Sequence, residues 1–277
     1  MTNKLESATY THGHHASVIR AHSWRTAANS AGYLLPYLKS DMKILDIGCG
    51  AGTITVDLAK YVPQGHITGL DQAESILDQA RALAKDTGVT NVDFVQGDAN
   101  ALEFPGNTFD VVVCHQVLQH VGEPTGILKE MRRVAKVGGF VAARESDYGS
   151  WVWYPAAEGL DNWRALYLNV ARSNRGEPNA GRMIHAWARD AGFPKADIQC
   201  TSSSWCLSTK EAVADWSKGW AERTESADSS FAKSAVGGQF ATAAEIAQVA
   251  VAWREWGQHE DAWISVPHGE IVCVKRD

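Results

Sequence analysis

Short apolar runs alternate with stretches of helical spacing along the first half of the chain. The apolar runs predict strands at residues 44–47, 66–70, 92–96, 109–114 and 140–144. The segments between them carry apolar side chains at helical spacing, first over 53–61 and then from about Ala73 onward. Such an alternation of strands and helices is typical of an α/β fold with a parallel sheet.

The second half of the chain predicts more helices and two further strands. Ser208 with Glu211, and Thr242 with Glu245, form S/T-x-x-E capping boxes that each predict a helix start. The second of these helices is expected to end at Gly257. The remaining predicted elements are helices near 160–171 and 181–191 and strands over 198–207 and 270–274. Together with the first five strands, the last two make a Rossmann-like sheet of seven strands that ends in an antiparallel hairpin.

Composition narrows the class of protein without naming its chemistry. The chain has 277 residues, of which 45% are hydrophobic and 21% charged, as in an ordinary globular protein. Its net charge of −6 argues against nucleic acid, because binding phosphates requires a basic surface. No run of about 18 apolar residues and no basic-then-apolar start occurs, so we expect no membrane span, no secretory signal and a cytoplasmic location.

Five cysteines lie at positions 49, 114, 200, 206 and 273. None forms a C-x-x-C pair, and none is spaced with histidines as zinc ligands are. We therefore interpret them as buried, reduced thiols and expect no metal site.

A glycine-rich turn follows the first predicted strand and carries the first chemical signal. Residues 44–52 read Ile-Leu-Asp-Ile-Gly-Cys-Gly-Ala-Gly, in which Gly48, Gly50 and Gly52 are spaced G-x-G-x-G. The dinucleotide fingerprint requires G-x-G-x-x-G, so a nicotinamide cofactor is disfavoured. Asp46 precedes the turn and would repel a pyrophosphate, whereas it suits a ligand with a positive charge. The combination favours S-adenosylmethionine (SAM), which has an ammonium and a sulfonium group.

Polar residues also follow the next three predicted strands. Asp71 ends the second strand, about 20 residues after the glycine turn, where an acid binds a ribose diol. Its alternative role is to cap the helix that starts near Ala73. Asp98 and Ala99 follow the third strand and suit an adenine ring, and His115 ends the fourth. Ligands bind at this edge of open α/β sheets, so a nucleotide-like ligand is expected there.

Residues 42–144 resemble class I SAM-dependent methyltransferases of the ubiquinone/menaquinone-biosynthesis (UbiE-like) type. The resemblance is carried by ILDIGCGAG, GLDQAESIL, QGDANALEFP, FDVVVCHQVLQHV and LKEMRRVAKVGGFV. It implies SAM contacts from Asp46, Gly48, Gly50, Asp71, Gln72, Asp98, Ala99 and His115. The N-terminal arm, with Tyr10 and Arg20, resembles the helices that fold over the SAM pocket in this family.

The distribution of tryptophan suggests where the methyl acceptor binds. None of the 11 tryptophans lies between Lys43 and Ser150: Trp24 precedes that region, and the other ten follow it. Helix packing explains any single one, but together they predict a cap with an aromatic wall for a hydrophobic small molecule. The acceptor-binding candidates are Trp24, Gln116, Trp151 and Trp153. The expected division of the chain is 1–41 (N-terminal cap helices), 42–147 (SAM-binding core), 148–268 (substrate cap) and 269–277 (terminal strand).

Four side chains are weak candidates for a general base: His115, His120, Glu145 and Asp147. The N-terminal arm and the tryptophan-rich tail resemble a fungal subgroup of these enzymes, the gliotoxin-type bis-thiomethyltransferases, which methylate two thiols of a reduced epidithiodiketopiperazine. This resemblance implies a thiol acceptor, for which a strong base is not essential. Two alternatives stay open: O- or C-methylation of another secondary metabolite or quinol, and a scaffold that binds SAM without methyl transfer. The oligomeric state is not predicted.

Overall fold

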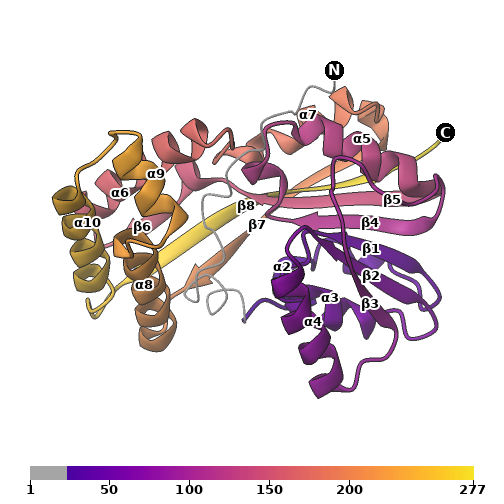
Figure 1. The fold of residues 1–277 in the computed structure, drawn as a ribbon, viewed down its shortest axis with the longest axis horizontal. Coiled ribbons are helices and arrows are strands. Elements are labelled where there is room, and N and C mark those ends of the chain that lie inside the picture. Colours follow the sequence, from indigo (N-terminus) through magenta and orange to yellow (C-terminus); the bar gives the residue numbers. More distant parts are fainter. Residues whose placement is uncertain (1–23) are drawn as a thin grey trace.

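A central sheet runs through the computed structural model, which describes residues 24–277 (Figure 1). Its order is β3-β2-β1-β4-β5-β8-β6, and β7 pairs with the other side of β8. The strands are β1 Lys43–Ile47, β2 His66–Asp71, β3 Val92–Gln96, β4 Phe109–His115, β5 Ala135–Ser146, β6 Val152–Tyr154, β7 Ile198–Leu207 and β8 Trp263–Val274. The α/β class and the seven expected strands are confirmed. The eighth strand, β6, has three residues and was not predicted; it pairs with the start of β8.

Strand direction places the predicted ligand-binding ends side by side. β1, β2, β3, β4 and β5 are parallel, while β8 is antiparallel to both β5 and β7. The carboxyl ends of β3, β2, β1 and β4 therefore follow one another along a single edge of the sheet.

Helices cover both faces of the sheet (Figure 1). On one face lie α2 Ala27–Ser30, α3 Thr53–Ala59 and α4 Glu74–Thr87, with the short η1 Leu35–Tyr37. On the other lie α5 Pro124–Val134 and α7 Ile184–Asp190. Each layer buries a separate apolar core, with Ile44 and Val113 facing α2 and α3, and Leu45 and Cys114 facing α5.

Four helices form a cap beyond the end of the sheet: α6 Glu158–Ser173, α8 Lys210–Glu225, α9 Ser230–Gly237 and α10 Ala243–Trp256. They pack on one another around β6 and the start of β8. The single-turn helices η2 Leu118–His120, η3 Tyr148–Ser150, η4 Ala180–Arg182 and η5 Lys195–Asp197 complete the connections. No helix within residues 24–277 is both long enough and apolar enough to cross a membrane.

Helix ends test the capping predictions. The Thr242–Glu245 capping box is present at α10, which ends at Gly257 as expected. The other predicted box is wrong by one residue: Thr209, not Ser208, caps α8 and accepts a hydrogen bond from the Ala212 amide. The last strand starts at Trp263 and not near 269, because the alternating residues that precede Pro267 pair with β7.

Candidate functional site

The glycine turn connects the end of β1 to the start of α3. Gly50 has φ +53° and no described atom within 4 Å of where a side chain would begin, so this peptide faces open space. Gly48 has φ +68°, and a Cβ there would lie 2.4 Å from the Val117 side chain. Packing therefore requires glycine at 48, whereas at 50 the left-handed conformation and the open approach favour it.

Asp46 lies beneath this turn and is 4% exposed. Its Oδ2 accepts a hydrogen bond of 2.6 Å from the Thr55 hydroxyl of α3. The pKa of Asp46 is raised to about 7, chiefly by burial; the Thr55 hydrogen bond opposes this shift, and nearby Asp71 adds to it. An ionised Asp46 therefore lacks a cationic partner among the described residues, which fits the binding of a positive ligand group beside it.

Asp71 joins two turns at the edge of the sheet. Its Oδ2 accepts from the Gly50 amide at 3.0 Å, and its Oδ1 accepts from the Ala73 amide at 3.1 Å. The carboxylate thus holds the glycine turn and also the turn before α4, but the N-cap residue of α4 is Ala73, without a side-chain cap, so Asp71 does not cap this helix. Each carboxylate oxygen has a second acceptor site for a ligand hydroxyl.

The remaining cofactor candidates lie at the ends of β2, β3 and β4. Gln72 and Asp98 are exposed, and Asp98 accepts from the Asn100 amide at 2.8 Å. Ala99 packs partly against the core beneath α5. His115, the last residue of β4, is 9% exposed, with its ring centroid 5.7 Å from that of Trp205. Tyr10 and Arg20 lie outside the described residues.

Gln116 is the centre of a small polar network. It has φ +55°, an uncommon value for a residue with a side chain. Its Oε1 accepts from Arg25 at 2.8 Å, and its amide nitrogen lies 2.9 Å from Nε2 of His268. Burial lowers the pKa of His268 well below its usual value, and Arg144 and Arg25 lower it further. The network therefore joins the chain before α2, the end of β4 and β8 through a neutral histidine.

Glu145 has a structural role, because its carboxylate binds backbone amides. It is fully buried and accepts hydrogen bonds from the backbone amides of Val117, Leu118 and Gln119, at 3.0, 2.9 and 3.2 Å. Burial raises the pKa of Glu145 to about 7, and these three amides oppose the shift. The carboxylate thus anchors the turn that follows Gln116.

Two more base candidates are also engaged. Asp147 forms a two-pronged ion pair with the guanidinium of Arg182. The Nε2 atom of His120 lies 3.0 Å from the Gln119 side-chain amide. Burial lowers the pKa of His120 to about 3, with Arg25 adding to the shift. Neither side chain is poised to remove a proton at neutral pH.

Most tryptophans form the interior of the cap and not the wall of a pocket. Trp151 is 2% exposed, stacks on Tyr148 at 4.5 Å and donates from Nε1 to Ser146. Trp153 is half-buried beneath the Arg164 guanidinium, 4.5 Å from its ring centroid. Trp151 thus packs inside the cap, and its role at the acceptor site stays a prediction. Trp24, by contrast, lines a cavity beside α2.

Sequence patterns missed several residues near the end of β4. His268 and Glu270 lie two apart on one face of β8, and Arg144 is the partner of Glu270 on β5. The available signal was polar side chains at alternate positions within otherwise apolar strands. Nothing in the sequence indicated which strands would bring them together.

The cysteines agree only in part with their interpretation. Cys114 and Cys273 are buried, but Cys200 and Cys206 are exposed on β7, an edge strand. All five are free thiols. The expectation that every thiol is buried was wrong because β7 pairs with a neighbour on one edge only and most of its side chains are exposed.

The strand order and the chain of acids and glycines at its edge define the class: this is a class I SAM-dependent methyltransferase fold. The methyltransferase-domain family model matches residues 38–191, more than half of the chain. The chain belongs to this methyltransferase-domain family, and its cofactor is SAM.

Relatives match either the whole chain or about two fifths of it. An uncharacterized methyltransferase of Schizosaccharomyces pombe is 33% identical over all of this chain and all of its own length. A demethylmenaquinone methyltransferase of Lactococcus lactis is 40% identical, but over 39% of this chain and 43% of its own. The crystal structure of the Bacillus subtilis YcgJ protein superposes with a TM-score of 0.59 at 20% identity, covering 90% of this chain and 99% of that one. At 20% identity, the similarity to the YcgJ protein shows a shared fold alone.

Proposed function

We propose that this methyltransferase transfers the SAM methyl group to the sulfur of a hydrophobic small-molecule thiol. The preferred acceptor is the dithiol of an epidithiodiketopiperazine such as reduced gliotoxin, as in the fungal UbiE-like subgroup that the sequence resembles. The full-length relative from a fungus supports a common architecture for cofactor core and cap.

The proposed SAM contacts follow from the chemistry of the strand ends. Asp46 would balance the positive amino-acid end, and Asp71 would accept from the ribose hydroxyls. Asp98 with Ala99 would contact the adenine, and Gly48, Gly50, Gln72 and His115 would line the space between. Tyr10 and Arg20 are proposed to cover the cofactor.

Methyl transfer from a sulfonium is a direct displacement. As the acceptor sulfur forms its bond to the methyl carbon, the bond from that carbon to the sulfonium sulfur breaks, and its electron pair remains on S-adenosylhomocysteine. The thiol proton is released to water. The chain must chiefly align the acceptor with the methyl group and exclude water, since such alignment supplies much of the rate.

The observation that carries the proposal is that three of the four candidate bases are engaged elsewhere or have a lowered pKa. Glu145 holds three backbone amides, Asp147 pairs with Arg182, and His120 has a pKa lowered to about 3 by burial. An acceptor that ionises readily on its own suits such a site. A thiol with a pKa of about 8.5 is already a few per cent thiolate at neutral pH, whereas a phenol with a pKa of about 10 is far less ionised.

Mass spectrometry with acceptor classes tests the proposal. The protein is incubated with SAM and, in separate reactions, reduced gliotoxin, simple dithiols, phenols, quinols and amines. We expect S-adenosylhomocysteine and methylated sulfur only with thiols. Replacement of His120 by Gln, Asp147 by Asn or His115 by Gln should each lower the rate by less than about a hundredfold, the low end for loss of a general base.

Each alternative gives a distinct result. Methylation of quinols without thiols would replace the thiol assignment with a quinone-type one. SAM binding in a calorimeter without S-adenosylhomocysteine formation from any class would favour a scaffold. A loss of about 10⁴-fold in one base variant, with SAM affinity intact, would contradict a base-independent mechanism.

A further inference from the structure

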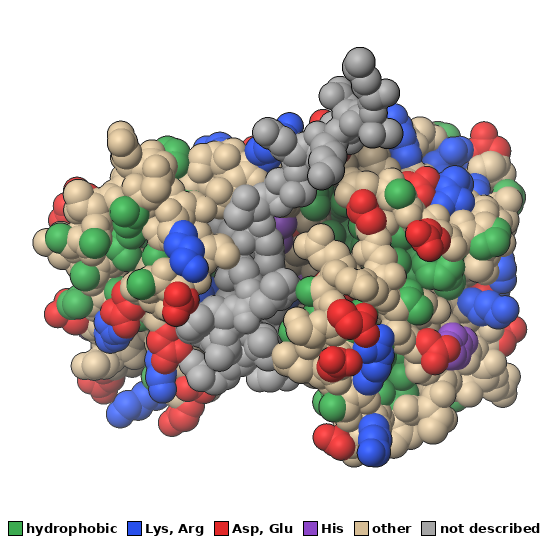
Figure 2. Space-filling model, in the orientation of Figure 1, with side chains coloured by type: hydrophobic (Ala, Val, Ile, Leu, Met, Phe, Trp, Pro, Cys, Tyr) green, Lys and Arg blue, Asp and Glu red, His purple; other side chains and the backbone are tan. Residues whose placement is uncertain are grey.

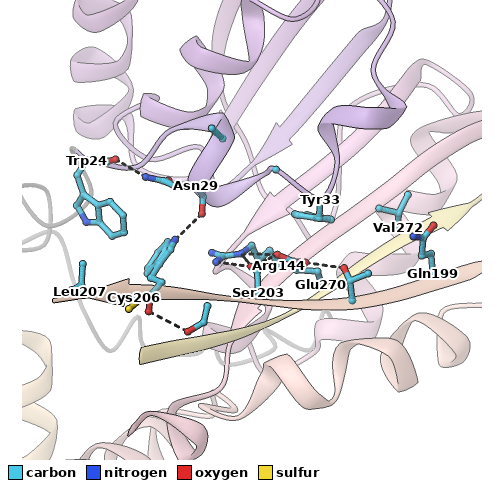
Figure 3. Close-up of a pocket in the computed structure, with 15 residues that line it drawn as sticks. Trp24, Asn29, Tyr33, Arg144, Gln199, Ser203, Cys206, Leu207, Glu270 and Val272 are labelled. Carbon is cyan, nitrogen blue, oxygen red and sulfur yellow. Dashed lines mark hydrogen bonds and ion pairs between the residues drawn. The ribbon is translucent and has the colours of Figure 1, made fainter. Parts of the chain in front are cut away.

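A cavity of about 610 Å³ lies on the α2 face of the sheet, between α2 and β7 (Figure 3). Arg144 of β5 and Glu270 and Val272 of β8 form its floor, while Trp24 and Tyr33 contribute from the α2 side. Its size falls in the range of pockets that hold small molecules. Arg144 is the strand partner of His115, so the cavity begins next to the end of β4.

The charged side chains on the cavity floor are paired with each other. Arg144 and Glu270 are the two charged residues among those described as lining it, and the Arg144 Nε lies 3.1 Å from Glu270 Oε1. Thr201 donates to the other Glu270 oxygen at 2.8 Å, and Ser203 donates to Oε1. With its charges already paired, the site favours neither an anion nor a cation, because an ionic ligand would lose its hydration without a free counter-charge.

Two polar atoms at the cavity have no described partner. The Nη1 of Arg144 and the hydroxyl of Tyr33 are both buried, and no residue of 24–277 forms a hydrogen bond with either. Arg144 is 1% exposed overall. A buried donor without a partner costs stability, and such exceptions are uncommon in native proteins. Each of these atoms can donate a hydrogen bond to a ligand oxygen.

The Arg144 guanidinium is held in place before any ligand arrives. Its Nε and Nη2 donate to the Ser203 hydroxyl at 3.3 and 3.2 Å, and its plane lies over Trp205 at 4.8 Å. A donor that is already ordered loses little entropy when it binds.

An aromatic wall completes the cavity. The rings of Trp24 and Trp205 meet edge to face at 4.8 Å. The indole nitrogen of Trp205 donates to the Asn29 carbonyl of α2 at 2.8 Å, which fastens this wall to the opposite side of the cavity. Such a surface suits a flat, apolar ring.

We propose that this cavity binds the methyl acceptor as a neutral ring compound, whose carbonyl or amide oxygen accepts from Arg144 Nη1 and Tyr33 while its apolar part contacts Trp24 and Trp205. The assignment to the acceptor rests on the proposed function. The neutral, oxygen-bearing class of ligand rests on the paired charges and the two unused donors.

The test uses the whole protein and cyclo(phenylalanyl-alanyl), a diketopiperazine with two amide carbonyls, one flat ring and no thiol. Calorimetry without SAM measures its affinity for the wild type, Tyr33→Phe and Ala28→Trp. Tyr33→Phe removes a hydroxyl with no described partner, so folding should be retained. We expect about three- to tenfold weaker binding, as for one neutral hydrogen bond. Ala28 is exposed at the cavity, and tryptophan there should fill it and weaken binding more than tenfold.

Two matched variants control the measurement. Tyr61→Phe removes an exposed hydroxyl, and Ala82→Trp adds an indole to the exposed side of α4. Both positions lie outside the cavity lining, so probe affinity should equal that of the wild type. SAM affinity of all four variants should be unchanged.

The outcomes separate this inference from the proposed function. Equal probe affinity in the wild type, Tyr33→Phe and Ala28→Trp, or no binding by the wild type, would overturn the cavity assignment even if thiols are methylated. Weakened probe binding without S-adenosylhomocysteine formation from thiols would support the cavity while refuting S-methylation. For whichever acceptor is methylated, Tyr33→Phe should raise KM more than it lowers kcat, and the reverse split would contradict a binding role.

Discussion

The two ends of the sheet are built from the sequence in different ways. At the cofactor end, Asp46, Gly50 and Asp71 come from one stretch of chain, and a hydrogen bond from the Gly50 amide to Asp71 joins them. At the cap end, Arg144 meets Glu270 across 126 positions of sequence. A site made from adjacent loops leaves a motif, whereas a site made by distant strand pairing leaves only single residues.

Tryptophan shows the same contrast within one residue type. Trp163 and Trp253 are fully buried and meet edge to face at 5.0 Å inside the cap. Trp205 is buried as well, yet it lines the cavity beside α2. Chain position alone does not distinguish a structural tryptophan from one that faces a ligand.

The largest expected effect is loss of SAM binding in Gly50→Val. Valine is strongly disfavoured at φ +53°, and its side chain would occupy the open approach to the turn. We expect no heat of SAM binding in a calorimeter. Gly88 also has positive φ, +70°, and open surroundings, but lies at the far end of α4. Gly88→Val should lose stability and keep SAM affinity.

Cys49→Ala changes the same glycine turn but should be tolerated. Burial raises the pKa of this thiol well above its usual value, so it is not a reactive thiolate. Turnover and SAM affinity should stay near wild type. Lost turnover with intact SAM binding would identify Cys49 as a catalytic thiol.

The sequence predicted the cofactor end closely because its elements are short and regular. The apolar run over β3, residues 92–96, matches the observed strand. In the cap, the Thr242 box opens α10 as expected. The short β6 was missed because a three-residue strand has too little periodicity to be recognised. The start of β8 was placed too late because Pro267 and Gly269 interrupt the apolar pattern.

Some residues of the candidate site were predictable from the sequence, and others were not. Residues expected to contact SAM do follow the ends of adjacent strands, since parallel strands and their order follow from the motif. The role of Glu145 as an anchor for three amides was not predictable, because it depends on how η2 sits over β5. The burial of Trp151 was equally unpredictable, because it depends on contacts with α6 and α8.

Trp163→Ala should separate cap stability from cofactor binding. The ring is fully buried among Trp151, Trp220 and Trp253, so its removal should cost about 3–5 kcal/mol in urea unfolding. Trp153→Ala, which removes a half-buried ring, should cost much less. If the stability of the cap is independent of the cofactor end of the sheet, SAM affinity should change less than about twofold in both variants. A large loss of SAM affinity would show that the two regions are coupled.

Asp71→Ala should weaken SAM binding by about tenfold to a hundredfold, or roughly 1.5–3 kcal/mol for charge-assisted hydrogen bonds. The same change releases the Gly50 and Ala73 amides, so part of the loss reflects a looser turn. Asp86→Ala, at an exposed position near the end of α4, should leave the calorimetric affinity unchanged. Wild-type affinity in Asp71→Ala would remove this carboxylate from the site.

A smaller change in SAM affinity than that of Asp71→Ala is expected from a pH dependence that belongs to Asp46. Its pKa in the folded protein is raised by burial from 3.8 to about 7, and a cationic ligand group favours the ionised form. As pH falls from 7 to 6, more of the protein must release a proton before SAM binds, so affinity should fall by about fivefold. Asp46→Asn should bind SAM more weakly at pH 7 and lose this slope, while Asp86→Asn should keep it.

Without SAM, the stability of the protein should depend on pH in the opposite direction. As the pH rises from 4 to 7, the unfolded chain releases the Asp46 proton while the folded chain retains it, so the stability of the wild type falls relative to that of Asp46→Asn. Parallel titration and melting curves for the two proteins would mean that Asp46 is already ionised beside another cation, and that the charge argument for its role is wrong.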